Sequence, residues 1–261
     1  MDSKCLSLLC DPDSHASLVL AEDALLNPES GMRYPIRDGV PVFLQEVTGQ
    51  NCKYQKMYDR LAPGYDVAER LYRWFAGLGG LRRRPDFRLE FIRELEIAPA
   101  ARVLEVSVGT GANLRYFHPD VEFYGLDLSW GMLRRCQRNL RKWPGSGELF
   151  QGEAEHLPFL DAGFDCVFHV GGINFFNDKA RAIEEMIRVA KPGTKIVIVD
   201  ETEKVVRGDY RKNPFTRKYY QGGESEAEAY CPIGLVPDAM REIQSRQIAS
   251  GKLYCLTFRK P

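Results

Sequence analysis

Residues that could hold a nucleotide-like cofactor lie in the middle of the chain, within residues 103–114. A mostly apolar run there ends in a turn of small residues that contains Ser107, Gly109 and Gly111. Because glycine has no Cβ, the backbone of such a turn can adopt positive φ, and a ligand can lie directly against it. A helix expected from Ala112 would point unpaired N–H groups and a partial positive charge at the same place.

An acidic residue, Asp127, follows this turn at the end of the next apolar run. A carboxylate has two acceptor oxygens, so it can bind the two vicinal hydroxyls of a ribose. The turn and this acid also fit a variant of the G-x-G-x-x-A motif of nicotinamide enzymes, with Ser107 in the first glycine position. The turn alone therefore leaves the cofactor open, and the residues that follow must decide it.

Alternating strands and helices after residue 101 supply the scaffold for these residues. The pattern predicts strands at 102–106, 121–126, 149–150, 164–170 and 195–200, and helices at 112–117, 129–143 and 179–190. Ser129 and Asp178 are the expected N-caps of the last two helices. Repeated strand–helix–strand units predict an α/β fold, with a doubly wound, mostly parallel sheet covered on both faces.

The end of the chain predicts two further strands, 242–248 and 252–258. The turn between them is too short for a parallel crossover, so they must form an antiparallel hairpin. Together with the parallel strands, this hairpin gives a seven-stranded sheet with an antiparallel ending.

Apolar residues at helical spacing fill the region 54–95. We expect helices near 54–61, 67–78 and 91–95, with Pro63 and Gly64 breaking the first from the second. We interpret 47–98 as a helical lid over a core domain, 99–261.

The first 46 residues predict a small β-rich module. The run YPIRDGVPVFL, residues 34–44, resembles the end of the zinc-ribbon family that includes the activator subunit of tRNA methyltransferases, in which two C-x2-C knuckles hold a metal. Here the knuckles have decayed to Cys10 and Asp13 in the first and Asn27 and Ser30 in the second. A single thiolate does not satisfy tetrahedral zinc. We therefore expect a module without metal, stabilised by packing against the main domain.

Four motifs in order resemble the class I S-adenosylmethionine-dependent methyltransferases, and in particular the group related to the ubiquinone and menaquinone C-methyltransferases. Residues 105–111, EVSVGTG, match the E/D-x-G-x-G-x-G motif except that Ser107 replaces the first glycine. Asp127 matches the acid at the end of the second strand. GEAEHLPF, 152–159, matches the GDAxxLPF segment, and FDCV with IRVAKPGT, 164–167 and 187–194, matches the later strand and junction.

The resemblance implies where S-adenosylmethionine binds. Asp127 takes both ribose hydroxyls, Glu153 accepts from the adenine amino group, and the next backbone N–H, at Ala154, faces the ring. Tyr58 and Tyr65 close over the cofactor as part of the lid. The residues expected at the cofactor are Tyr58, Tyr65, Glu105, Ser107, Gly109, Gly111, Asn113, Asp127, Leu128, Met132, Glu153, Ala154, Val170 and Gly171.

The implied reaction is an in-line displacement, in which an O, N, S or C nucleophile attacks the methyl group on a sulfonium. The protein mainly aligns the partners and excludes water. A general base would lie at the carboxyl edge of the sheet, where His169 and Asp200 are expected, although His169 could instead be a packed strand residue. The aromatic-rich segment 202–237 predicts a substrate cap.

Composition excludes several other classes of protein. Lys+Arg and Asp+Glu both number 36, so no global positive field favours nucleic acid or a membrane surface. No apolar run approaches the roughly 18 residues of a membrane span. Seven cysteines without a repeating spacing predict reduced thiols and a cytoplasmic location.

We interpret the chain as a methyltransferase acting on a small molecule such as a phenol, quinol or thiol. The sequence leaves three alternatives open: a nicotinamide-dependent oxidoreductase, a non-catalytic binding subunit with a methyltransferase fold, and an RNA methyltransferase. The zinc-ribbon resemblance favours the last of these, and the balanced charge opposes it. The oligomeric state is not predicted.

Overall fold

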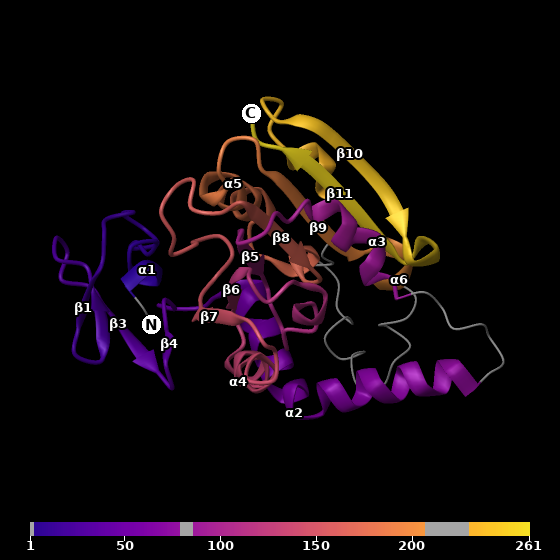
Figure 1. Cartoon of the computed structure of the whole chain (residues 1–261), viewed down its shortest axis with the longest axis horizontal. Helices are drawn as coiled ribbons and strands as arrows, with labels where there is room; N and C mark the ends of the chain where they lie inside the picture. The colour runs from indigo at the N-terminus through magenta and orange to yellow at the C-terminus, as the bar shows by residue number, and fades with distance from the viewer. Residues whose placement is uncertain (1–2, 79–85, 207–229) are drawn as a thin grey trace.

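Seven strands form a central sheet in the order β10-β11-β9-β8-β5-β6-β7 (Figure 1). This computed structural model describes residues 3–78, 86–206 and 230–261, and of residues 65–78 it describes the backbone alone. The parallel strands are β5 (Arg102–Val106), β6 (Glu122–Asp127), β7 (Ser146–Gln151), β8 (Cys166–Val170) and β9 (Lys195–Glu201). Each pairs in parallel with its neighbours in that set, which confirms the predicted doubly wound sheet.

Two antiparallel strands complete the sheet and confirm the predicted hairpin. β10 (Arg241–Ile248) pairs with β11 (Leu253–Arg259), and β11 pairs antiparallel with β9. Ala249 and Ser250 adopt positive φ of 52° and 58° in the turn, which lets the chain reverse within a few residues. An antiparallel strand beside β9 distinguishes this sheet from the 3-2-1-4-5-6 order of dinucleotide-binding folds.

Helices cover both faces of the sheet, as predicted. Apolar side chains of α4 (Trp130–Leu140) join the cluster on one face, and those of α5 (Lys179–Val189) join the cluster on the other. Ser129 and Asp178 are N-caps, whose side chains accept from the backbone N–H three residues later at 3.2 and 2.9 Å. The shorter helices are α1 (Ser3–Leu6), α3 (Arg88–Ile92), α6 (Glu203–Val205), and the 3-10 turns η1 (Arg93–Leu95), η2 (Leu114–Tyr116), η3 (Ile173–Phe175), η5 (Pro232–Leu235) and η6 (Ala249–Gly251).

One long helix, α2 (Gly49–Leu78), runs through Pro63, so the predicted break at Pro63-Gly64 is wrong. Proline removes one backbone N–H and normally kinks or ends a helix. The helix docks on α4 at this position: Arg135 donates to the Pro63 carbonyl at 2.8 Å, and a Cβ on Gly131 would lie 2.9 Å from the Cβ of Ala62. Across the described ranges, no helix has both the length and the apolar character needed to cross a membrane.

Residues 112–117 are described, and they do not form the α-helix that the sequence predicted. Only the 3-10 turn η2 follows the glycine turn, and Phe117 already has extended backbone. His118 precedes Pro119, which disfavours helical backbone at His118, and the chain must soon enter β6. No α-helix therefore begins directly after the glycine turn, and the dipole contribution predicted for a helix from Ala112 is wrong.

The N-terminal module, residues 3–46, lies beside the β7 edge of the sheet (Figure 1). Its four-stranded sheet contains β1 (Val19–Ala21), β2 (Ala24–Leu26), β3 (Arg33–Arg37) and β4 (Val40–Pro41), which confirms the β-rich prediction. The module shares an apolar cluster with the main domain. That cluster includes Leu9, Leu25, Tyr34 and Phe43 of the module and Phe150, Phe159 and Phe164 of the main domain.

Two tight turns of the module face each other where the sequence predicted decayed knuckles. Asp11 Oδ1 accepts from the N–H groups of Asp13 and Ser14, and Asn27 Oδ1 accepts from the N–H of Ser30. Asn27 Nδ2 links the turns by donating to Asp11 Oδ2 at 2.8 Å. The first turn thus begins at Asp11, one residue later than predicted. No group of three or more His, Cys, Asp or Glu side chains in the described residues could hold a metal ion.

Candidate functional site

The strand register brings the predicted cofactor residues to one edge of the sheet. Val106, the last residue of β5, lies opposite Leu126 of β6 and His169 of β8, and Asp127 lies opposite Gln151 of β7. Because these strands are parallel, their carboxyl ends meet at the same edge. In open α/β sheets this is the edge at which ligands bind.

The small-residue turn after β5 has the conformation that a close ligand contact requires. Ser107, Gly109 and Gly111 all have positive φ, of 63°, 55° and 73°. A Cβ on Gly111 would lie 2.7 Å from Cys136 Sγ, whereas a Cβ on Gly109 would meet nothing within 4 Å. Gly111 therefore allows close packing under the turn, and Gly109 presents bare backbone to open space where a ligand fits.

Ser107 occupies a conformation that disfavours any residue with a Cβ. Left-handed backbone strains an L-residue by about 1–2 kcal/mol, and the greater freedom of unfolded glycine offsets part of this. We therefore expect Ser107→Gly to raise the free energy of unfolding by about 0.5–1 kcal/mol, measured by urea denaturation. The matched change Ser129→Gly removes an N-cap and should instead lower the free energy of unfolding. A Ser107→Gly variant less stable than the parent would contradict the strain argument.

Asp127 ties the turn to the end of β6. Its Oδ2 accepts from the N–H of Gly109 at 2.7 Å, and its Oδ1 accepts from the N–H of Ser129 at 2.8 Å. Burial raises the pKa of Asp127 to about 6, although these N–H donors oppose the rise. A carboxylate already aligned with two donors at a strand end is well placed to receive two ribose hydroxyls.

Glu105 is a deeply buried acid of the site, with 1% of its surface exposed. Its Oε1 accepts from Asn113 Nδ2 at 2.6 Å, and Asn113 Oδ1 in turn accepts from Arg88 Nε at 3.0 Å. Its Oε2 is buried without a hydrogen-bond partner among the described residues. An unpaired buried carboxyl oxygen beneath the glycine turn fits a site that a polar ligand completes.

Burial raises the pKa of the Glu105 carboxyl to about 8, so this group makes stability depend on pH. The folded protein retains a proton that the unfolded chain releases near pH 4.5, so stability falls as pH rises between these values, by up to about 1.4 kcal/mol per pH unit. We expect Glu105→Gln to remove this slope, so that the stability of the variant relative to the parent rises as pH increases from 5 to 8. Urea denaturation midpoints measured across that pH range test this prediction. The same pH dependence of the midpoint in both proteins would contradict it.

The GEAEHLPF segment lies against the N-terminal turns of α2. Asn51 Nδ2 donates to Glu153 Oε1 at 2.7 Å and to Glu155 Oε1 at 3.1 Å. Gln55 Nε2 donates to the carbonyl of Leu128 at 3.2 Å. The sequence analysis missed Asn51 and Gln55. The sequence offers one sign of their role: both are polar and lie on the face of α2 that also carries the buried Tyr54 and Met57. The residues to which Asn51 and Gln55 donate, however, lie far away in the sequence.

The remaining predicted cofactor residues fall into three groups. Met132 and Ala154 are buried, and Leu128 and Val170 are half-buried at the same sheet edge. Gly171 has a φ of 81°, and a Cβ there would meet nothing within 4 Å, as at Gly109.

The two tyrosines of the predicted lid, Tyr58 and Tyr65, are only partly described. Tyr58 is half-buried and packs against an apolar cluster that contains Tyr54, Met57 and Phe175, and the Tyr54 ring stacks on Phe175 with centroids 4.3 Å apart. This places Tyr58 beside the loop that follows β8. The side chain of Tyr65 lies outside the described residues.

His169 is held by the protein itself, so the geometry does not support its predicted catalytic role. Its Nε2 accepts from the N–H of Ile173 at 3.0 Å, which leaves Nδ1 as the donor to the carbonyl of Val106, also at 3.0 Å. The ring is fully buried, and burial lowers its pKa. A neutral imidazole with both nitrogens engaged links the end of β5 to the loop after β8 and has no free nitrogen to accept a proton.

Asp200 has an equivalent structural role. Its Oδ2 accepts from the N–H groups of Gly172 and Asn174 at 3.2 and 2.9 Å, and its Oδ1 accepts from the N–H of Glu201 at 2.8 Å. With 1% of its surface exposed, it fixes the loop after β8. The geometry therefore supports a role for Asp200 in holding this loop in place, and does not support its predicted catalytic role.

The predicted substrate cap, 202–237, is described only at its two ends. Residues 207–229 lie outside the described residues, including four of the five aromatic residues that suggested the cap. Tyr230 is described, with the Lys179 ammonium 5.1 Å from its ring centroid. These two residues, with Phe176 and Leu235, line an open depression of about 320 Å³ beside the start of α5.

The strand order of the central sheet is that of the class I methyltransferase fold, and comparison with known proteins agrees. Residues 104–198 match the family described as "Methyltransferase domain". A solved structure from Thermotoga maritima, titled as a SAM-dependent methyltransferase and possible histamine N-methyltransferase, shares the fold. Its TM-score is 0.56 at 21% identity, covering 78% of this chain and 100% of that one.

The chain is similar in sequence to the ubiquinone and menaquinone group, as the motifs implied. It is 33% identical over 161 residues to a ubiquinone/menaquinone biosynthesis C-methyltransferase of Syntrophotalea carbinolica, covering 59% of this chain and 65% of that protein. It is 34% identical over 145 residues to a demethylmenaquinone methyltransferase of Renibacterium salmoninarum, covering 55% and 56%. The chain thus spans less than two thirds of the length of these relatives.

Proposed function

We propose that this chain transfers the methyl group of S-adenosylmethionine to a small-molecule acceptor. The observation that carries the proposal is the convergence of the bare backbone at Gly109, the carboxylate of Asp127 and the Glu153–Ala154 segment on adjacent strand ends. The sulfonium of this cofactor supplies an electrophilic methyl group on a good leaving group. The printed names of the relatives favour a quinol-type aromatic acceptor methylated at carbon.

The residues of the site bind and orient in this proposal. Asp127 accepts from the ribose hydroxyls, Glu153 and the Ala154 N–H take the adenine edge, and Gly109 and Gly171 allow the ligand to lie against the backbone. These groups come from four different strand ends, and their preset spacing lowers the entropy lost when donor and acceptor are aligned. Tyr58 and the neighbouring stacked pair of Tyr54 and Phe175 help exclude water from one side.

In this proposal neither His169 nor Asp200 acts as a general base, because both are engaged in holding the loop after β8. An ionised quinol would activate its own ring carbon through the electron pair of its oxygen. That carbon would take the methyl group as the carbon–sulfur bond of the donor breaks, and its ring proton would then pass to water to restore the aromatic ring. Alignment of that carbon with the methyl group is then the main contribution of the protein.

A binding experiment followed by turnover tests this function. Isothermal titration with S-adenosylhomocysteine should give one site per chain, and NAD and NADP should give none. Turnover with methyl-labelled donor should then be detected on a quinol in a panel that also contains phenols, thiols and amines. Binding of a dinucleotide without S-adenosylhomocysteine would overturn the proposal in favour of an oxidoreductase. Binding without transfer to any acceptor would favour a non-catalytic binding protein.

A further inference from the structure

The segment 151–160, which contains Glu153 and Ala154, depends on distant parts of the chain for its conformation. Beyond Gln151 it forms no helix and no extended strand, and one backbone bond, from the His156 N–H to the Glu153 carbonyl, closes within it. A segment with so few internal bonds is ordered mainly by its tertiary contacts.

The N-terminal module makes those contacts at both ends of the segment. The Phe43 N–H donates to the Gln151 carbonyl at 2.7 Å where the segment leaves β7. At the other end, the Cys10 N–H donates to the Pro158 carbonyl at 3.0 Å, and the Leu160 N–H donates to the Leu8 carbonyl at 2.8 Å. The module therefore holds the segment with three backbone hydrogen bonds, formed across more than a hundred residues of sequence.

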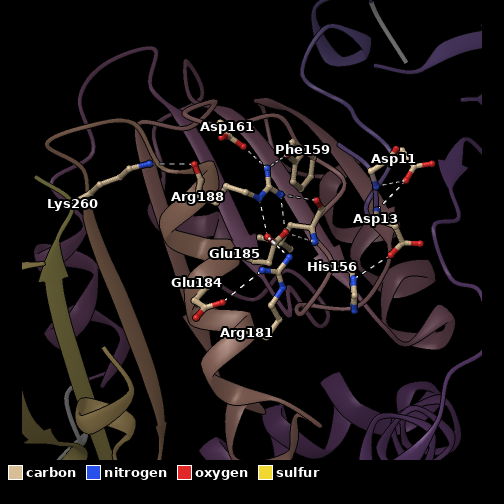
Figure 2. Close-up of polar contacts among 12 residues, drawn as sticks. Asp11, Asp13, His156, Phe159, Asp161, Arg181, Glu184, Glu185, Arg188 and Lys260 are labelled. Carbon is tan, nitrogen blue, oxygen red and sulfur yellow. Dashed lines mark hydrogen bonds and ion pairs between the residues drawn. The ribbon is translucent and has the colours of Figure 1, made fainter. Parts of the chain in front are cut away.

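Side chains reinforce this attachment. Leu9 pairs with Phe159 in an isolated antiparallel bridge, and both are buried in the same apolar cluster. Phe43 packs against Gly152, where a Cβ would lie 3.8 Å from the Phe43 Cβ. Figure 2 also shows the half-exposed pair of His156 and Asp13, which are 3.3 Å apart and contribute little because both face water.

The opposite side of the segment is held from α5. Glu185 Oε2 accepts from the Leu157 N–H at 2.9 Å, and Arg188 donates to the carbonyls of Leu157 and Phe159 at 3.0 and 2.6 Å (Figure 2). These bonds fix only the second half of the segment. Glu153 and Ala154 lie in the first half, between the Phe43 and Cys10 attachments, where Asn51 of α2 also donates to Glu153 Oε1.

We propose that the N-terminal module is an internal positioning element, which holds Glu153 and Ala154 in the conformation that binds the adenine of the donor. The inference rests on the proposed function and deepens it. When the module loosens, the binding-competent segment is populated for only a fraction of the time, and the apparent Kd rises by the inverse of that fraction. The kcat at saturating donor stays unchanged, because a fully bound donor keeps the segment in its binding-competent conformation.

Two variants of the full chain loosen the module without altering Glu153 or Ala154. Asn27→Ala removes the amide that links the two turns, and Phe43→Ala removes the ring that packs on Tyr34, with centroids 4.9 Å apart. Leu20→Ala, at a side chain that is 52% exposed, is the matched control within the module. We expect both loosened variants to raise the Kd and KM for the donor by about tenfold at unchanged kcat, which corresponds to a competent population near one tenth. The control should match the parent.

Hydrogen exchange of the unaltered protein provides a test that does not depend on the folding of any variant. Coupling is reciprocal, so S-adenosylhomocysteine should slow exchange at the Cys10 and Phe43 amides of the module as well as at Ala154. Protection at Ala154 with no change at Cys10 and Phe43 would overturn the proposal, as would a parent-like Kd in both loosened variants. If the parent protein does not bind S-adenosylhomocysteine at all, the proposed function fails instead.

Discussion

Replacing Asp127 with alanine is expected to weaken binding of S-adenosylhomocysteine by about 100-fold, because the ligand loses two charge-assisted hydrogen bonds of roughly 1.5 kcal/mol each. The carboxylate stands at the end of β6, with its two oxygens already aligned on the N–H groups of Gly109 and Ser129. Isothermal titration measures the change directly. Circular dichroism should show that the variant remains folded.

Asp165→Ala is the matched control, because it makes the same change at the opposite, amino-terminal edge of the sheet. The Asp165 side chain is 38% exposed and pairs with Lys191. Its removal should leave the Kd for S-adenosylhomocysteine within about twofold of the parent, since exposed pairs contribute little. Equal losses in the two variants would mean that Asp127 acts on general stability and not on the ligand.

The pH dependence of binding gives a second measure of the Asp127 carboxylate. Burial raises its pKa to about 6 in the free protein, and only the ionised form accepts from two hydroxyls. The Kd should therefore be constant above pH 7 and rise as pH falls through 6, approaching tenfold per pH unit. Asp127→Asn should bind more weakly at pH 8 and lose this dependence.

Local chemistry explains why much of this site could be predicted from the sequence. The positive-φ turn, the acid at the end of β6 and the caps at Ser129 and Asp178 depend on residues within a few positions of one another. Parallel strands then bring such ends together at one edge. The register of β5, β6 and β7 confirms that convergence.

Most errors of the sequence analysis concern contacts between distant segments, whereas the missing helix at 112–117 has a local cause in Pro119. Pro63 breaks an isolated helix, but docking of α2 on α4 overrides that local preference. His169 lies at the predicted edge, yet the Ile173 N–H and the Val106 carbonyl engage both of its nitrogens. Asn51 joins the site only because α2 lies against residues 153–155. None of these contacts has a local pattern in the sequence.

The buried ion pair of Glu185 and Arg188 leads to the largest expected effect on stability. Glu185 is fully buried, and the Arg188 side chain is 14% exposed. Arg188 donates to both Glu185 oxygens, to Asp161 and to two carbonyls of the segment 151–160 (Figure 2). Arg188→Met should lower the free energy of unfolding by about 3 kcal/mol, because it strands a buried carboxylate and deprives two carbonyls of their donors.

Arg181→Met is the matched control on the same helix. Arg181 also pairs with Glu185, at 3.2 Å, but its side chain is 39% exposed, so its loss should lower the free energy of unfolding by less than about 1 kcal/mol. A double variant, Glu185→Leu with Arg188→Met, removes the stranded charge and should recover part of the loss. Urea denaturation followed by circular dichroism measures all three proteins. A double variant no more stable than Arg188→Met would show that the bonds to the segment, and not the stranded carboxylate, dominate the loss.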